Sequence, residues 1–575
     1  MKPEDLKIGY FSFGRAEHNY GLANCLYFAR RRGFKAQQIS ARDARKCDVV
    51  LLSCYWWEHF YDLIRFIVDA GIDPKKGKPF VLVGGFQTSQ NPMPIDPFIT
   101  AGFIGDGEEG LSECLSAFAR DGVSIDAIRD IPGVYVPGQR TPVKYQSIAN
   151  MRIPTDYQED STSKVRRVEI TRGCKFKCGF CALAFLKPYR ETPIEQINEA
   201  MRSSKLKNVA LFGPERTNHS RYADLEGLIK KYGKNNLASD IRLESLKKVK
   251  TVSNIRMGIE GVSFRLRRMI GKSFTDEMIV EAVSHMRSMK AARDLKKNNI
   301  PGQNNVVEGK GACLMYLILD LPSERREDYE AWTGLLEKLE AIPDPESFTL
   351  FPSPNVFIPT PHTPMQFFGI NPFGQHRRWW RYAMRGADGN RIWKYKIAMR
   401  DTAFSASKRV MSMLAVRGDE RAAKVMYNLV TNRPLMTALR KLSNEQAGMQ
   451  MLALAERSGI REEELIGEYP TNKQLPWEWI ETYTDDAYLR RYCETIKRRA
   501  EQGLVEFMPD EKIETLTATG DVIAAKASEM PNCSDGALMD GRLMGASRDD
   551  DDDCFEFDDD EDVDAMAVRS LPVLQ

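Results

Sequence analysis

The sequence predicts an α/β protein whose N-terminal part, residues 1–155, is a doubly wound, Rossmann-like domain. Residues 48–53 and 80–83 are near-continuous apolar runs, as expected of parallel strands covered on both faces. A helical pattern at residues 21–32 separates the first of these runs from a strand-like segment at residues 7–13. This alternation of strands and helices predicts a parallel sheet whose ligands bind beyond the carboxyl ends of its strands.

Three cysteines in one loop follow a short strand-like run and a turn at Gly173. Cys174, Cys178 and Cys181 have the spacing C-x-x-x-C-x-x-C. Three thiolates at this spacing can bind three irons of a cuboidal [4Fe-4S] cluster and leave the fourth iron open to a small molecule. The alternative is a zinc loop or a set of buried thiols. Zinc knuckles usually need a fourth ligand at short range, and no His or Cys follows within thirty positions of Cys181.

The cysteine spacing, with Phe180 before the last cysteine, resembles the signature of the radical S-adenosylmethionine (SAM) superfamily. The resemblance implies that SAM binds the open iron through its amino and carboxylate groups. In that family an electron from the cluster breaks the sulfonium, and the 5′-deoxyadenosyl radical so formed abstracts hydrogen from a substrate. A reductant such as flavodoxin or ferredoxin is then an expected partner.

Residues 156–370 resemble the radical SAM barrel, a partial (β/α) barrel with its chemistry at the carboxyl ends of the strands. A strand-like run at residues 209–212 leads into Gly213-Pro214-Glu215. The family commonly has a G-G-E turn there, whose backbone meets the SAM amino group. Pro214 departs from that pattern and removes one backbone donor.

A second strand-like run, residues 255–259, leads into Glu260-Gly-Val-Ser263-Phe-Arg265, which resembles the family's G-x-E-x-x-S-x-R stretch. There, Ser and Arg commonly bind the SAM carboxylate, Arg through paired hydrogen bonds. The alternative is a surface Arg on a helix that begins at a Ser cap. The resemblance implies that SAM is held by Gly213, Glu215, Glu260, Ser263 and Arg265.

Two later segments also resemble the family. Residues 320–328 resemble its G-L-P-x-E-x-x-E-D turn, with Asp320 in place of Gly, and residues 357–367 resemble its P-x-P-H-T-P-x-Q segment. The catalytic residue that faces the substrate stays unknown. Its candidates are Tyr316, Glu244 and His362, and each of them can equally have a structural role.

The N-terminal segment resembles the cobalamin-binding-like domain of one radical SAM branch, on the turns at residues 84–85 and 105–109. The cobalamin signature is D-x-H-x-x-G. Here His18 occupies the place of the ligand, while Ala16 replaces the Asp that would orient its imidazole. Cobalamin is therefore left open. The alternative is a Rossmann-like domain without cofactor that covers the active site.

Residues 371–510 predict a helical C-terminal domain, with apolar positions at helical spacing in residues 408–416, 422–429 and 486–500. Residues 376–382 and 391–396 interleave aromatic and cationic side chains, a mixture that suits stacking on bases beside phosphate contacts. The alternative is a helix whose Trp residues pack on the barrel. Residues 511–575 are expected to be a largely disordered acidic tail.

Composition and charge narrow the class of protein. At 575 residues, with 42% hydrophobic and 28% charged residues, the chain predicts about three globular domains. The sequence shows no signal peptide or membrane-spanning run, and its eleven cysteines favour a reducing cytoplasm. Without residues 549–575, 81 basic residues stand against 68 acidic ones, a net charge of +13. This charge favours a polyanionic partner. The acidic tail can mimic or repel that partner, or only keep the protein in solution.

Three functions are compatible with these observations. The first is radical modification or isomerisation of a nucleobase in DNA or RNA, such as a hypermodified thymine in phage DNA. The basic body supports it, and the sequence shows no second cluster motif that could supply sulfur or accept electrons. The second is a cobalamin-dependent radical methyltransferase acting on a small molecule. The third is an iron–sulfur sensor without enzymatic activity.

Overall fold

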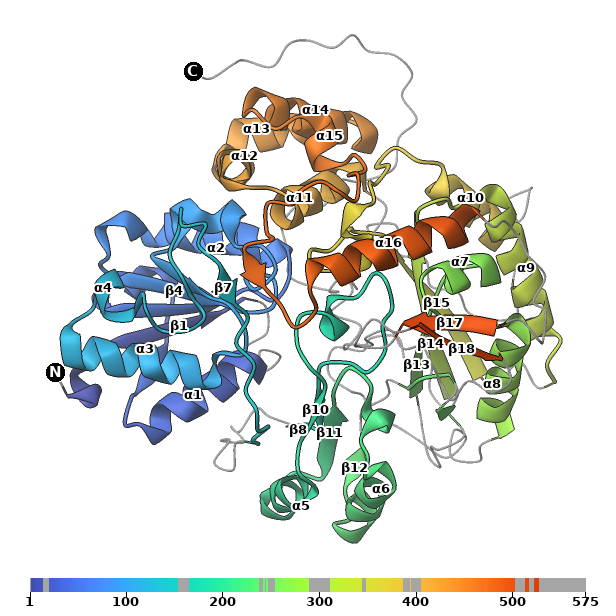
Figure 1. Cartoon of the computed structure of the whole chain (residues 1–575), viewed down its shortest axis with the longest axis horizontal. Coiled ribbons are helices and arrows are strands. Elements are labelled where there is room, and N and C mark those ends of the chain that lie inside the picture. The colour runs from blue at the N-terminus through green and yellow to red at the C-terminus, as the bar shows by residue number, and fades with distance from the viewer. Residues whose placement is uncertain are drawn as a thin grey trace.

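The structure is a computed structural model and describes most of the chain. The described residues are 2–13, 20–153, 165–236, 241–243, 245–246, 254–272, 274–288, 311–343, 348–385, 393, 405–501, 512–516 and 522–526. Within them, no helix is both long enough and apolar enough to cross a membrane. The N-terminal domain, the barrel and the helical domain follow one another along the chain (Figure 1).

The N-terminal domain is a six-stranded sheet that is parallel except for its last strand, which confirms the predicted doubly wound fold (Figure 1). In sheet order the strands are β2 (Ala36–Gln38), β1 (Ile8–Ser12), β3 (Val49–Ser53), β4 (Phe80–Gly84), β5 (Ala101–Phe103) and β6 (Val134–Tyr135). Helices α1 (Tyr20–Arg31) and α3 (Gly107–Asp121) cover one face, and α2 (Glu58–Ala70) covers the other.

Alternate residues of the central strands feed two separate cores. Val49 and Leu51 of β3 pack with the α1 and α3 side, whereas Val50 and Leu52 pack with α2. Successive side chains of a strand point to opposite faces, so a strand covered on both sides must be apolar throughout. The near-continuous apolar runs of the sequence follow from this arrangement.

The barrel is built from two parallel three-stranded sheets with alternating helices. The strands are β8 (Arg166–Glu169), β11 (Asn208–Phe212) and β12 (Asn235–Asn236), then β13 (Asn254–Glu260), β14 (Gly311–Leu319) and β15 (Phe348–Val356). The helices are α5 (Ile194–Ser203), α6 (Tyr222–Lys231), α7 (Phe264–Met269), α8 (Asp276–Ser288) and α9 (Arg326–Glu340). The Ile241 N–H donates to the Arg256 carbonyl at 3.1 Å, and this hydrogen bond links the chain after β12 to β13. The partial (β/α) barrel is confirmed.

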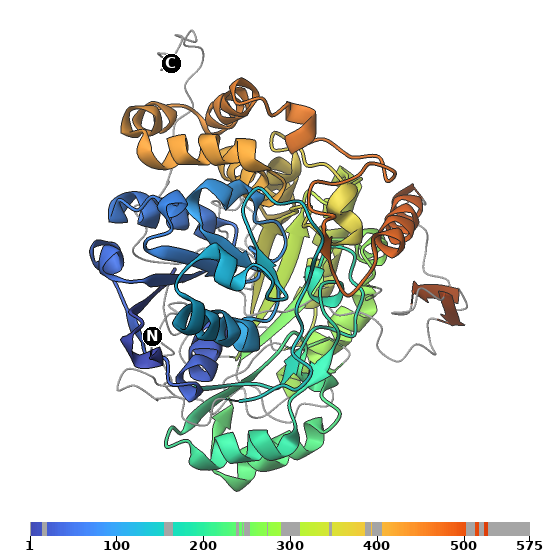
Figure 2. The same cartoon turned by 60° about the vertical axis from the view of Figure 1, so that its left-hand side comes forward.

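The helical domain lies above the other two in Figure 1. Its helices are α11 (Ala406–Val416), α12 (Glu420–Thr431), α13 (Arg433–Leu439), α14 (Asn444–Arg457) and α15 (Glu462–Leu465). The chain then returns across the barrel as α16 (Asp486–Glu501), beside α7 (Figures 1 and 2). The three helices predicted in this region are confirmed as α11, α12 and α16.

Shorter elements complete the described chain. Strand β7 (Val143–Lys144) pairs with β16 (Ile480–Glu481), and β9 (Thr171–Arg172) pairs with β10 (Arg190–Glu191). The short helices are α4 (Ile125–Ile128), η1 (Pro3–Asp5), η3 (Ala41–Lys46), η4 (Pro74–Lys76), η5 (Met93–Phe98), η6 (Ala182–Ala184), η7 (Arg216–Asn218) and η11 (Pro364–Phe367). A hairpin of β17 (Lys512–Leu516) and β18 (Val522–Lys526) lies in the segment expected to be disordered; the rest of that segment is outside the described residues.

The aromatic and cationic stretch at residues 376–382 forms helix α10 (His376–Arg385), whose tryptophans pack against α9. The Trp380 ring is buried and stacks on Trp332, with centroids 6.2 Å apart. Trp379 contacts Tyr329 at 5.8 Å. These tryptophan rings therefore pack on the barrel, as the alternative interpretation of the sequence states, and they are not placed to stack on bases.

Asp320, which stands where the family has Gly, ties the helical domain to the barrel. It follows β14 with φ 58°, a left-handed conformation that Asp tolerates better than most residues. Its carboxylate pairs with buried Arg409 of α11 and lies 3.5 Å from the His376 Nδ1 of α10. Burial acts to raise the pKa of Asp320, but Arg409 and His376 hold it below its usual range.

We expect Asp320→Asn to lower the free energy of unfolding by about 3–5 kcal/mol, because it leaves the buried Arg409 without a counter-ion. Asn keeps the left-handed backbone, so the loss reports the charge. The matched control is Asp43→Asn, which breaks an exposed pair with Lys46 and should leave the unfolding curve unchanged. Denaturant unfolding measures both variants. Equal unfolding curves for Asp320→Asn and the parent would contradict the stabilising role of the Asp320–Arg409 pair.

Candidate functional site

The cysteine loop is irregular backbone buried where barrel and C-terminal helix meet. Cys174 and Cys178 are buried and Cys181 is half-buried. The Gly179 N–H donates to the Ile270 carbonyl at 3.0 Å, and the Gly179 carbonyl accepts from the Met365 N–H at 3.1 Å. Two segments distant in sequence therefore hold the loop, one through the N–H of Gly179 and the other through its carbonyl.

The three thiols fit the ligand set of a [4Fe-4S] cluster. Burial, together with the charge of Cys181, raises the pKa of Cys174 to about 12. Burial also raises the pKa of Cys178, on which the charges of both other thiols act. Among the described residues, no three His, Cys, Asp or Glu side chains are placed to hold a single metal ion. Three thiolates from one C-x-x-x-C-x-x-C loop can each bind a different iron, so this donor set suits a cluster.

Glu215 lies at the end of the turn after β11, where its side chain is buried. Gly213, at the start of the turn, packs so closely on Thr171 that a Cβ would overlap its side chain. One Glu215 oxygen accepts from the Thr217 N–H at 2.9 Å. The other, Oε2, has no hydrogen-bond partner within the described chain. Burial raises the pKa of Glu215, and the cation of Arg242 acts to lower it.

Glu260 ends β13 and forms a buried pair with Lys272. The Lys272 Nζ donates to Glu260 Oε1 at 3.1 Å and to the Gly258 carbonyl at 2.7 Å. A Cβ at Gly258 would overlap both charged groups, which explains the G-x-E pattern at this strand end. Glu260 Oε2 has no protein partner among the described residues. The Lys272 charge also acts to lower the pKa of Cys178, against the larger effect of burial.

Two carboxylates thus lie near the cysteine loop, and each has one buried oxygen without a partner. The charge of Glu215 acts on the Cys174 thiol, and Lys272, the partner of Glu260, acts on Cys178. A buried acceptor without a donor costs about 1–3 kcal/mol. An ammonium group, such as the amino group of SAM, is a donor from which either oxygen can accept. The two carboxylates therefore suit the amino group of SAM, as the three thiols suit the cluster.

Ser263 and Arg265 are placed differently from Glu215 and Glu260. Ser263 caps α7 and donates to Asp328 Oδ1 at 2.5 Å. Arg265 pairs with Asp328 at 2.5 Å and donates to Ser323 Oγ at 3.0 Å. Both side chains anchor α7 to the start of α9 in this structure, and their predicted contact with the SAM carboxylate stays a prediction.

The candidates for a catalytic residue have separate places. Tyr316 is buried on β14. His362 is buried, and its Nε2 lies 3.0 Å from the Gln90 carbonyl of the N-terminal domain. Burial lowers the pKa of His362 to about 4, so its ring is neutral at pH 7 and suited to this structural contact. Glu244 lies outside the described residues.

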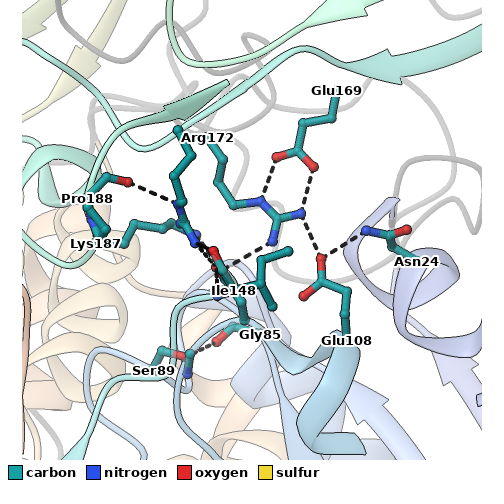
Figure 3. Close-up of polar contacts among 12 residues, drawn as sticks. Asn24, Gly85, Ser89, Glu108, Ile148, Glu169, Arg172, Lys187 and Pro188 are labelled. Atoms are coloured by element: carbon teal, nitrogen blue, oxygen red, sulfur yellow. Dashed lines mark hydrogen bonds and ion pairs between the residues drawn. The ribbon is translucent and has the colours of Figure 1, made fainter. Parts of the chain in front are cut away.

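A buried charge network, which the sequence did not predict, connects the N-terminal domain to the cysteine loop. Arg172, two residues before Cys174, pairs with Glu169 of the barrel and with Glu108 of α3, each at 2.7 Å (Figure 3). Asp106, also at the start of α3, accepts from Arg190 at 2.9 Å. Each of these residues is typical of a surface when taken alone, so no sequence signal showed that they meet.

Three cations of this network surround the carboxylate of Asp106. Lys187 lies 3.2 Å from its carboxylate and Arg172 lies 3.4 Å away. Although burial acts to raise it, these cations and Arg190 hold the pKa of Asp106 well below its usual range. The turn at residues 105–109, noted in the sequence as a family feature, therefore serves as an interdomain contact.

The strand ends of the N-terminal sheet are partly covered by protein. The buried loop after β4 reaches α11, where Asn91 Nδ2 donates to the Val416 carbonyl at 3.0 Å and to the Gly418 carbonyl at 2.8 Å. His18, the candidate cobalt ligand, lies outside the described residues. The described residues therefore do not test cobalamin binding, which the sequence leaves open.

Comparison with protein families agrees with this geometry. The model of the radical SAM superfamily matches residues 168–308, which contain all three cysteines and Glu215 and Glu260. The model of the N-terminal part of radical SAM proteins matches residues 34–137. Residues 168–308 therefore contain a radical SAM domain. This domain implies a [4Fe-4S] cluster and SAM, and the three cysteines of the loop are its predicted cluster ligands.

Other comparisons add little. No curated protein matches the sequence. Among solved structures, the cobalamin-dependent S-adenosylmethionine radical enzyme OxsB with aqua-cobalamin bound is similar, with 11% sequence identity and a TM-score of 0.44. The match covers 86% of this chain and 80% of that one. A likeness of this size carries no conclusion about ligands.

We expect Glu215→Gln to weaken SAM binding by about 10–100-fold, the value of a charge-assisted hydrogen bond of about 1.5–3 kcal/mol. The amide keeps an oxygen for Thr217 but presents a donor to the SAM amino group. Equilibrium binding of SAM to the reconstituted protein measures the change, with iron content as the test of an intact site. Glu226→Gln, on the outer helix α6, is the control. Unchanged SAM affinity in Glu215→Gln contradicts the assignment.

The charge network makes a separate prediction about pH. The pKa of Asp106 is lower in the folded state than the unfolded value of about 3.9, so its contribution to stability is fully present above pH 4 and is lost as the pH falls below it. We expect Asp106→Asn to destabilise the protein by about 3–5 kcal/mol at pH 7, with the difference from the parent shrinking below pH 4. Denaturant unfolding at several pH values measures this. Glu109→Gln, exposed on the same turn, should match the parent throughout.

Proposed function

We propose that the chain cleaves SAM reductively and uses the resulting radical to rearrange a nucleobase in DNA or RNA, such as a hypermodified thymine in phage DNA. The observation that carries the radical chemistry is that two buried cysteines and the half-buried Cys181 lie near Glu215 and Glu260, each of which has an oxygen without a partner among the described residues. When bound, the cluster and SAM supply a 5′-deoxyadenosyl radical that abstracts hydrogen.

The chain's own residues bind, orient and shield. Cys174, Cys178 and Cys181 hold three corners of the cluster. Glu215 and Glu260 accept from the SAM amino group, and the Lys272 ammonium, 3.1 Å from Glu260, favours the ionised carboxylate. The burial of these groups excludes water, which strengthens their electrostatic interactions and protects a radical from side reactions.

Charge supports a nucleic-acid substrate. The net charge of +13 for the chain without residues 549–575 favours a polyanion. Helix α10 packs its tryptophans inward and exposes Arg378, Arg381 and Arg385 to solvent. Exposed arginines bind phosphate without needing a free aromatic ring beside them. The support therefore comes from the charge of the body and of this helix, not from stacking.

A redox-neutral isomerisation fits the cysteine inventory. Apart from the cluster ligands, the described cysteines are free thiols at scattered positions in the N-terminal domain, barrel and α16: Cys25, Cys47, Cys54, Cys114, Cys313 and Cys493. Among these cysteines the shortest spacing is the seven residues from Cys47 to Cys54, so they show no second C-x-x-x-C-x-x-C motif. In an isomerisation the abstracted hydrogen returns to the product radical, so the substrate gains or loses no electrons.

Two measurements test the proposal. Binding of the reconstituted protein to duplex DNA or single-stranded RNA should weaken steeply as salt rises, because phosphate contacts release counter-ions. Anaerobic protein with SAM and a reductant should form 5′-deoxyadenosine, and the correct nucleic acid should yield a nucleoside of altered retention and unchanged mass.

Cys178→Ala is the control, since it should bind nucleic acid like the parent and form no 5′-deoxyadenosine. Binding that is absent or independent of salt contradicts the nucleic-acid substrate. A product of changed mass contradicts isomerisation and leaves the radical chemistry standing.

A further inference from the structure

Helix α16 and the segment before it cover one side of the cysteine loop. The Tyr483 N–H donates to the Leu186 carbonyl at 3.1 Å, and the Thr484 N–H donates to the Phe185 carbonyl at 3.0 Å. At the other end of the helix, the Ala500 carbonyl accepts from Arg265 at 3.4 Å. The helix is therefore fixed at both ends, more than three hundred residues after the cysteines in sequence.

Two glycines let this helix approach closely. A Cβ at Gly179, between the second and third cysteines, would lie 2.5 Å from Ile496 Cδ1. A Cβ at Gly271 would lie 2.7 Å from the Tyr492 hydroxyl. Both distances are far below van der Waals contact, so a larger residue at either position would force the side chain of Ile496 or Tyr492 to move. The glycines beside the cysteines and the side chains of α16 therefore have complementary shapes.

Tyr492 bonds to the backbone between two cysteines. Its hydroxyl donates to the Lys177 carbonyl at 2.7 Å. Because the peptide is planar and trans, the Cys178 N–H points opposite to that carbonyl, away from α16. The hydroxyl thus fixes the direction of a backbone dipole at a cluster ligand.

The side chain of Lys177 is held beside the same ligands. Its Nζ donates to the Ala184 carbonyl at 2.9 Å and lies over the rings of Phe185, Tyr483 and Tyr488 at 5.0–5.8 Å. No ion pair of Lys177 with a carboxylate is present within the described chain. Lys175, in the same loop, differs: it is half exposed and lies 3.6 Å from Glu191.

We propose that Tyr492 and Lys177 are positioning residues that raise the reduction potential of the cluster. The potential of an iron–sulfur cluster depends on net charge, on hydrogen bonds to its sulfurs and on solvent exposure. A partly buried cation and a fixed backbone N–H both favour the reduced cluster, which carries one more negative charge. This inference rests on the cluster of the radical SAM family and is independent of the substrate.

The charge is tested with Lys177→Met, which keeps the length of the side chain. Full-length reconstituted protein is titrated redox-potentiometrically without SAM or nucleic acid. We expect a tenfold lower equilibrium constant for one-electron reduction, which is about 59 mV. The matched control is Lys175→Met, whose charge is exposed and paired, and which should shift the constant less than threefold.

The hydrogen bond is tested with Tyr492→Phe, which keeps the ring and its shielding. We expect the equilibrium constant for reduction to fall about threefold or more. Tyr488→Phe is the control, because that hydroxyl has no hydrogen-bond partner in the described part of the chain. Its constant should equal that of the parent. Iron and sulfide content must be the same in every variant compared.

Equal potentials in the parent, Lys177→Met and Tyr492→Phe, at equal iron content, overturn the proposal. A Lys175→Met shift as large as that of Lys177→Met also overturns it, because the effect would then be one of total charge. If Lys177→Met fails to hold iron, the comparison of Tyr492→Phe with Tyr488→Phe decides. Since no nucleic acid is present, failure here is distinct from failure of the proposed substrate.

Discussion

The constraint on which this structure depends is that a loop without regular secondary structure must be buried and rigid at once. Buried backbone groups need hydrogen-bond partners, and the cysteine loop obtains them from Ile270, Met365 and Tyr492. These partners come from the segment after α7, from η11 and from α16. The shape of the cysteine loop therefore depends on three segments distant from it in sequence, and not on the cysteine motif alone.

Charge burial explains how the first domain joins this arrangement. Asp106 and Glu108 at the start of α3 meet Arg172 and Arg190, which flank the cysteine loop on β9 and β10. Ions taken from water are tolerated when opposite charges and hydrogen bonds surround them, and removing one partner is costly. Such a contact holds only one relative placement of the two domains. Asp106 and Glu108 follow β5, so this contact places the carboxyl end of that strand beside β9 and the start of the cysteine loop.

The sequence predicted what depends on local pattern. The apolar runs of β3 and β4 and the helical spacing of α11, α12 and α16 were sufficient for the fold, and the cluster ligands that the cysteine spacing predicts stay a prediction. It could not predict pairings between distant residues. Nothing in the sequence linked Tyr492 to Lys177, or Arg172 to Glu108, because each contact forms only once the chain has folded. The same reason explains why Arg265 resembles a SAM ligand in its motif and yet contacts Asp328 here.

The late position of α16 in the chain has a consequence for how the protein matures. About three hundred residues separate Cys181 from the segment that covers it, and at roughly 5–20 residues per second their synthesis takes roughly 15–60 s. During that interval the cysteines have been synthesised, but α16 has not. Until α16 is made, that side of the cysteine loop is uncovered, whereas in the finished chain α16 packs against it.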